Sequence, residues 1–223
     1  MFDLQTQRKP DFSRAYAVAN EILITSTSIS SFPFSPKELV KEQSATVCRS
    51  YKKAQKYGVD IRNFGSESAT LFHFHGKAII FYDETKPQAH INYSILHELG
   101  HDKMGHPLSS IDDLTYRCYE IETNYFAAQL LMPEQLLREL QRRGVRLTIP
   151  FLQSAFGVSA QAAQKRINTL NKLNTSWRSQ EEQLFDDIIL AKFADFLDEI
   201  APRREFDDFE EEYERQRERE EWW

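Results

Sequence analysis

Residues 94 to 101 read Ser94-Ile95-Leu96-His97-Glu98-Leu99-Gly100-His101, and the interpretation of the whole chain starts from this stretch. On a helix, His97 and His101 lie one turn apart on the same face, so their two imidazoles can bind one Zn²⁺. Glu98 would then reach a water on that metal and act as its general base. The helix also has an apolar side that would pack against a core; it consists of Ile95, Leu96 and Leu99. This pattern is typical of a zinc peptidase.

The composition indicates a globular protein that is not embedded in a membrane. The chain has 223 residues, of which 41% are hydrophobic, and its two cysteines, Cys48 and Cys118, are too few for a disulfide framework. No apolar run approaches a membrane span, and the first residues lack the pattern of a signal peptide, so we expect a cytoplasmic protein. The net charge of −6 arises entirely from the segment that begins at Glu205. The remainder is close to balanced, which gives little support to non-specific nucleic-acid binding.

Apolar periodicity predicts helices at about residues 12–26, 36–42, 45–57, 90–105 and 114–132, the last of which ends before Pro133. Strand signals occur at residues 69–75, which alternate, and at residues 78–82, which are apolar. Gly76-Lys77 separates them, so they predict a hairpin beside the metal helix. His73 and His75 would share one strand face and could be ligands, but His97 and His101 need only one more protein ligand.

Candidates for that third ligand lie on the predicted helix 114–132. Glu122 shares a helix face with Phe126 and Gln129, whereas Glu120 aligns with the more polar Tyr116 and Asn124. Periodicity alone does not choose between the two carboxylates. His106 follows His101 by five residues, about 140° round the helix, so it would not bind the metal directly unless the chain turns at Gly105. It is either a residue behind the ligands, a substrate contact or a surface histidine.

These residues resemble the ImmA/IrrE family of metallo-endopeptidases. The resemblance covers about residues 12 to 172, and its second motif is matched by Glu122-Thr123-Asn124-Tyr125-Phe126-Ala127-Ala128-Gln129-Leu130-Leu131-Met132-Pro133. It implies a mostly helical, zincin-like α+β domain with a small β-sheet. It also implies that Glu122 joins His97 and His101 as a zinc ligand, with Glu98 as catalytic base. The candidates for orienting these residues or contacting substrate are Tyr93, Ser94, His106 and Asn124.

Beyond Pro133, the spacing of residues 149 to 173 predicts a helix-turn-helix-like hairpin. Lys165 and Arg166 could face DNA, but packing of the hairpin under the metal helix is the preferred interpretation. A long amphipathic helix is expected at residues 181–200, where it docks on the body or pairs with another chain. The acidic residues from 203 onwards indicate a solvated helix or tail, which ends at Trp222 and Trp223 as an unstructured terminus or as an anchor for a partner.

We therefore expect a metallopeptidase domain at residues 1–135, the helix-turn-helix-like segment at 136–175, the amphipathic helix at 176–202 and the tail at 203–223. The resemblance implies a zinc endopeptidase that cleaves a helix-turn-helix transcriptional repressor and so derepresses phage, mobile-element or stress genes. The alternative is a non-catalytic module that binds a repressor or DNA through residues 149–173. The expected partner is a protein, with neither a membrane nor direct DNA binding.

Overall fold

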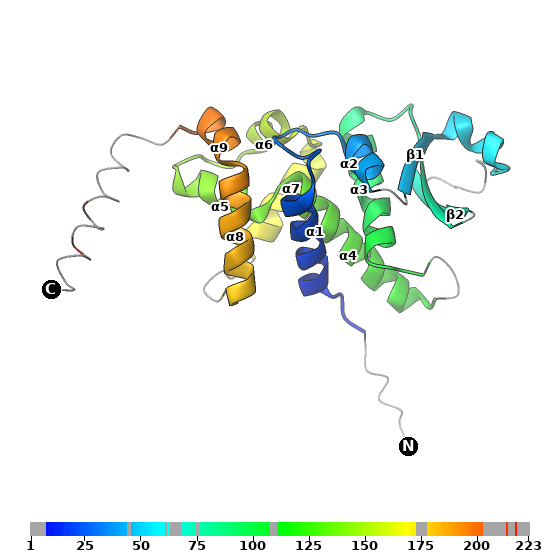
Figure 1. Ribbon diagram of the computed structural model, residues 1–223, viewed down its shortest axis with the longest axis horizontal. Coiled ribbons are helices and arrows are strands. Elements are labelled where there is room, and N and C mark those ends of the chain that lie inside the picture. Colours follow the sequence, from blue (N-terminus) through cyan, green and yellow to red (C-terminus); the bar gives the residue numbers. More distant parts are fainter. Residues whose placement is uncertain are drawn as a thin grey trace, which may run out of the picture.

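The computed structural model describes residues 8–43, 46–60, 62, 68–74, 76–107, 111–172, 178–202, 213 and 217. Within this part, helices predominate and one small sheet lies at one end (Figure 1). The elements are α1 Phe12–Thr25, α2 Pro36–Glu42, β1 Thr46–Ser50, the 3₁₀ helix η1 Tyr51–Tyr57, β2 Ala69–Phe74, β3 Lys77–Tyr82, α3 Gln88–Lys103, α4 Asp113–Leu131, α5 Glu134–Arg142, α6 Ile149–Phe156, α7 Ala160–Leu170, α8 Gln180–Lys192 and α9 Ala194–Ile200. The predicted α+β class is confirmed.

The described sheet has three strands in the order β1-β3-β2. The predicted hairpin pairs β2 with β3 antiparallel, with Leu71 opposite Ile80. The prediction of one helix over residues 45–57 was wrong. Residues 46 to 50 instead form β1, which pairs parallel with β3, and only the lysine-bearing residues 51 to 57 are helical. A parallel neighbour supplies the hydrogen bonds that make β1 a strand, and β2 is left at the edge of the sheet.

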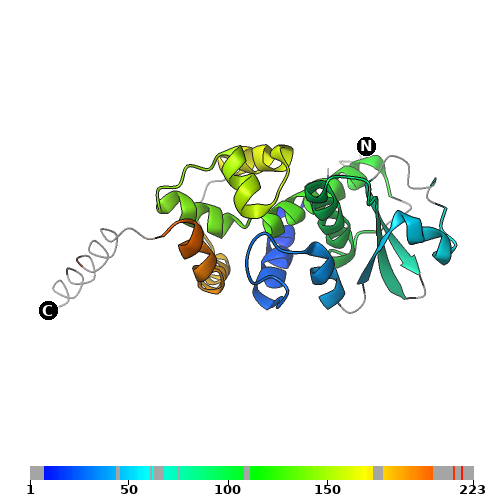
Figure 2. The same ribbon diagram turned by 90° about the horizontal axis from the view of Figure 1, so that it is seen from above.

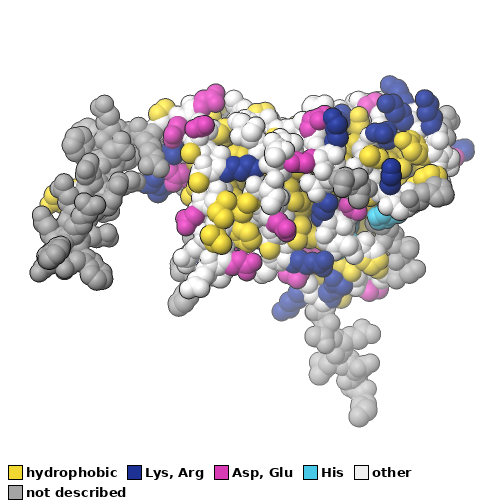
Figure 3. Space-filling view, viewed as in Figure 1, with side chains coloured by type: hydrophobic (Ala, Val, Ile, Leu, Met, Phe, Trp, Pro, Cys, Tyr) yellow, Lys and Arg dark blue, Asp and Glu magenta, His cyan; other side chains and the backbone are white. Residues whose placement is uncertain are grey.

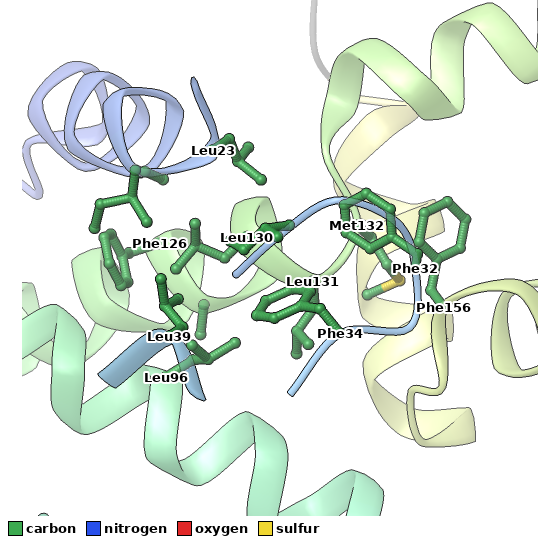
Figure 4. Packing of buried hydrophobic residues seen from close by; sticks show 14 of the residues in the cluster. Leu23, Phe32, Phe34, Leu39, Leu96, Phe126, Leu130, Leu131, Met132 and Phe156 are labelled. Carbon is green, nitrogen blue, oxygen red and sulfur yellow. The ribbon is translucent and has the colours of Figure 1, made fainter. Parts of the chain in front are cut away.

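Helices α1, α3 and α4 enclose the main apolar core. Figure 4 shows Leu23 of α1, Leu96 of α3 and Leu130 of α4 converging on it. Further along, Phe32 and Phe34 extend the core to Phe156 of α6 (Figure 4). The core therefore runs without a break from the sheet-side helices to the later helices.

Gly100 allows α3 and α4 to approach closely. A Cβ at this position would lie 2.9 Å from Cδ1 of Phe126 and 3.3 Å from Cγ2 of Thr123. We expect Gly100→Ala to lower the free energy of unfolding by about 1–3 kcal/mol, because a ring in a packed core must move. Denaturant titration measures this loss. Without a steric clash, the same change in a helix interior would stabilise by up to about 1 kcal/mol, so a gain would contradict the close packing.

The helix-turn-helix-like pair α6 and α7 packs on the body of the domain (Figure 2). Arg166 of α7 is only 1% exposed. Its Nε donates to the carbonyl oxygen of Met132 at 2.9 Å, and its Nη2 donates to Oε1 of Gln129. Gln129 in turn donates to Asn20 of α1 at 2.8 Å. This buried network supports the packed-hairpin interpretation and keeps Arg166 away from any phosphate.

The predicted C-terminal helix is divided at Phe193 into α8 and α9. Most of its apolar stripe docks on the body, through the buried residues Ile189, Phe193, Phe196 and Leu197. Leu184 and Ile188 remain 58% and 38% exposed, and Figure 3 shows hydrophobic side chains at the surface in the region of α8. Apart from residues 213 and 217, the predicted tail at 203–223 with Trp222 and Trp223 lies outside the described residues. Among the helices that are described, none has the length and apolar character needed to cross a membrane.

Candidate metal centre

One face of α3 and one face of α4 form the site. On α3, residues at spacings of three and four place His90, Tyr93, His97 and His101 in one row, as expected for a helix. The same spacing on α4 places Tyr116, Glu120 and Asn124 in one row. The two helices are in extensive contact, so the rows lie close to each other.

The donor groups of three side chains from these rows converge. Nε2 of His97 and Nε2 of His101 are 3.3 Å apart. Each nitrogen is also 3.3 Å from an oxygen of Glu120, the first from Oε2 and the second from Oε1. Burial alone would raise the pKa of Glu120, but the hydrogen bonds and charges of His101 and His97 lower it below its usual value. Glu120 is therefore a carboxylate that points at both imidazoles.

The spacing of these atoms fits a metal ion. In a tetrahedral zinc site with bonds of about 2.0–2.1 Å, ligand atoms lie about 3.3–3.4 Å apart. The two nitrogens have this separation, and each lies equally far from one of the two oxygens of Glu120. Among the described residues, His97, His101 and Glu120 form the one group of three whose donor atoms are close enough to share an ion. The donor set of two imidazoles and one carboxylate is common in catalytic zinc sites, where the fourth position is open.

The expectation that Glu122 is the third residue of this group does not agree with the structure. Glu122 is 2% exposed, and its Oε2 lies 2.9 Å from Nε2 of His106. Its Oε1 accepts a hydrogen bond of 2.9 Å from the backbone N–H of Asp11. Positions two apart on a helix diverge by about 200°. Glu120 therefore faces His97 and His101, while Glu122 faces the core behind them.

His106 connects Glu122 to the metal group. The chain turns at Gly105, where φ is +60°, and brings Nδ1 of His106 to 3.2 Å from Nδ1 of His101. When Nε2 of His101 is a ligand, its Nδ1–H can donate to His106, whose Nε2–H can donate to Glu122. Burial and the nearby His101 lower the pKa of His106, which favours this neutral form. These three residues form the Glu122-His106-His101 hydrogen-bond chain.

Two residues that contact the Glu122-His106-His101 hydrogen-bond chain were not predicted from the sequence. Asp11, just before α1, supplies the backbone N–H that caps it. Tyr119 stacks on the ring of His106, with ring centroids 4.0 Å apart and planes 20° apart. Asp11 carried no sequence signal, because its contribution is a backbone group. Tyr119 is three residues before Glu122 on the same helix face, which would have been the only indication.

Glu98 lies beside the three donors, in the wall of an open cleft of about 460 Å³ that is lined by β2, α3 and α4. Its Oε2 accepts a hydrogen bond of 2.9 Å from the backbone N–H of Leu71 on β2. The sheet edge therefore holds the carboxylate next to the metal group. Ser94 also lines the cleft.

Two other predicted residues join α3 to α4. The hydroxyl of Tyr93 donates to Oδ1 of Asn124 at 2.8 Å, and Nδ2 of Asn124 donates to the carbonyl oxygen of Glu120. Burial, aided by the charge of Glu120, raises the pKa of Tyr93 to about 12, so its hydroxyl remains protonated. His73, the alternative ligand, instead lies 3.5 Å from Asp102, and His75 is outside the described residues.

Comparison with known families shows to which family the chain belongs. The profile of the IrrE N-terminal-like domain, Peptidase M78, matches residues 54–168, more than half of the chain. That match begins in η1 and includes α3, α4 and nearly all of α7. No curated protein matches the chain. The resemblance to the ImmA/IrrE family is thus confirmed, and the chain belongs to the IrrE N-terminal-like family with a metallopeptidase-type domain.

Proposed function

We propose that this protein is a zinc-dependent endopeptidase in which His97, His101 and Glu120 hold the metal. The observation that carries the proposal is the convergence of Nε2 of His97, Nε2 of His101 and the carboxylate of Glu120, next to Glu98 in an open cleft. When bound, zinc supplies a Lewis acid that polarises the scissile carbonyl and makes a water acidic near neutral pH. Nitrogen and oxygen ligands with an open position favour zinc over magnesium or calcium.

Glu98 acts as the proton carrier of the reaction. Its carboxylate accepts a proton from the attacking water and returns it to the leaving amine. The N–H of Leu71 holds one oxygen, Oε2, and thereby orients the carboxylate in the wall of the cleft.

The edge of β2 supports a polypeptide substrate. Ala69, Thr70 and Leu71 of β2 line the cleft. Leu71 directs its N–H away from β3, to Glu98, so residues of the same parity, such as Ala69, direct their backbone groups to the outer edge of β2. A substrate in extended conformation can add to this edge as a further strand.

The substrate in our proposal is a helix-turn-helix repressor, cut to derepress phage, mobile-element or stress genes in the cytoplasm. The family resemblance supports this choice, and the site residues support the chemistry. The non-catalytic alternative receives less support, because Arg166 in the proposed DNA-facing segment is buried and held by Met132 and Gln129. We also propose the division at residues 135, 175 and 202 as functional segments.

Metal removal tests the proposed activity. The purified chain is incubated with a helix-turn-helix repressor encoded by a neighbouring gene, and cleavage is followed by mass spectrometry. We expect a single cut that a zinc chelator abolishes and added Zn²⁺ restores. The reason is that activation of the attacking water depends on the bound metal. Cleavage that continues after complete chelation would contradict the proposal. A panel of unrelated folded proteins serves as the control for specificity.

A further inference from the structure

A second cavity lies alongside the catalytic cleft, between α4 and α7. Its volume is about 450 Å³, within the range of ligand-binding pockets. We call it the α4–α7 groove; its walls include Phe12, Ile121, Tyr125, Ala128, Ala162 and Lys165. Phe12 and Ile121 are 48% and 44% exposed, which leaves substantial apolar surface in contact with solvent.

The groove adjoins the catalytic cleft. His90 and Tyr93 line both cavities, and they belong to the α3 row that continues to His97 and His101. Along α4, Tyr116 and Glu120 line the cleft, whereas Ile121, Asn124 and Ala128 line the groove. A single extended segment can therefore cross the metal group and continue into the groove.

The charge of the groove is one-sided. Its lining contains Lys165 and Arg166 but no carboxylate, in a chain with 34 acidic and 28 basic residues. Lys165 forms no ion pair with the described residues. Arg166 is buried and donates to Met132 and Gln129, so its charge is directed into the body of the protein. The groove thus combines apolar walls with the positive charge of Lys165.

We propose that the α4–α7 groove is a specificity subsite for the polypeptide substrate, which binds an apolar side chain with a neighbouring Asp or Glu. The occupant is the part of the substrate that flanks the scissile bond, because the groove adjoins the cleft at His90 and Tyr93. Apolar burial supplies the affinity, and Lys165 selects the acidic neighbour. This inference rests on the proposed endopeptidase function.

Variants of α7 test the groove without altering the metal group. Lys165→Glu reverses the charge and Ala162→Trp fills the apolar space. Arg166 is left unchanged because it holds Met132 and Gln129. Lys172→Glu and Ala160→Trp are matched controls, since both residues are exposed and do not line the groove. Ala160 is the first residue of α7, and Lys172 lies two residues after its end.

The probe is a synthetic library of random short peptides, and the cleavage products of the full-length protein are sequenced by mass spectrometry. We expect an apolar residue beside Asp or Glu at a fixed distance from the cut. Lys165→Glu should lower cleavage of these peptides about three- to tenfold and shift the preference to Lys or Arg. Ala162→Trp should lower it at least about tenfold, and the two controls should retain the wild-type preference.

A binding measurement separates the groove from the activity. The same library is passed over immobilised full-length Glu98→Gln protein, and the retained peptides are sequenced. Cleavage with a preference that neither Lys165→Glu nor Ala162→Trp changes would overturn the groove proposal and leave the peptidase proposal intact. Retention of acidic–apolar peptides that Lys165→Glu abolishes, without cleavage by the wild type, would support the groove and overturn the peptidase. If the library is neither cleaved nor retained with this preference, the groove proposal fails.

Discussion

Glu98→Gln should lower the rate of substrate cleavage by a factor on the order of 10² to 10⁴ while zinc content stays at about one per chain. Glutamine has the shape of glutamate, and its amide oxygen can still accept the hydrogen bond from the N–H of Leu71. It cannot take up the proton of the attacking water. Initial rates and metal analysis on the same preparation measure the two quantities together.

Glu21→Gln is the control for this change, because Glu21 is an exposed residue of α1 outside the cleft. It should retain wild-type cleavage and zinc. Normal turnover by the Glu98→Gln protein would mean that another group carries the proton. Loss of zinc in the same variant would instead mean that Glu98 acts through the metal group and would remove the separation of roles proposed here.

Glu120→Gln should lower the affinity for zinc by more than about 100-fold, whereas Glu122→Gln should lower it by about 10- to 100-fold. The first change removes a carboxylate that faces both imidazoles at 3.3 Å. The second removes the charge at the end of the Glu122-His106-His101 chain but leaves all three donor atoms in place. Competition with a chelating dye measures both affinities on folded protein.

The opposite order of zinc affinities would contradict the assignment of Glu120 as a ligand. From the family resemblance alone, Glu122→Gln would remove the metal and Glu120→Gln would not. If the dye titration gives that order, the metal is held by Glu122 after a rearrangement of α4, and the group of His97, His101 and Glu120 is not the binding geometry. Circular dichroism of both variants guards against loss of zinc through unfolding, which matters most for buried Glu122.

The helices that carry the site could be predicted from sequence to within about two residues. For α3, the H-E-x-x-H pattern and the apolar residues Ile95 and Leu99 define a face and a core side at once. For α4, Pro133 marks the end. In both cases the information is local, so one sequence is sufficient.

The third donor could not be predicted with the same certainty, because it depends on how α3 and α4 pack. Glu122 shares a face with Phe126 and Gln129, and all three are buried. That face is the core, whereas a catalytic ligand must border an open position. Glu120 lies on the more polar row with Tyr116 and Asn124, which borders the cleft. The polar character of that row was visible in the sequence. The sequence did not show that the row faces the histidines of α3.

The missed strand β1 has the same explanation. Thr46 to Ser50 are too few to show a period, and they become a strand only because β3, which lies about 30 residues later, provides a parallel partner. The turn at Gly105 was recognised in sequence as the condition for His106 to approach the ligands. Only the folded chain shows that the condition is met.

The contact between Asp11 and Glu122 bridges 111 residues and has a consequence for protein synthesis. The two histidines leave the ribosome before Glu120. The hydrogen bond between Asp11, just before α1, and Glu122 can form only after α4 has been synthesised. Folding during translation proceeds from the N-terminus, so the incomplete chain carries H-E-x-x-H without its carboxylate partner. In the endopeptidase proposed above, a growing polypeptide that ends before Glu120 therefore lacks the carboxylate of the metal group, and the hydrogen bonds behind His101 form only after α4 has been made.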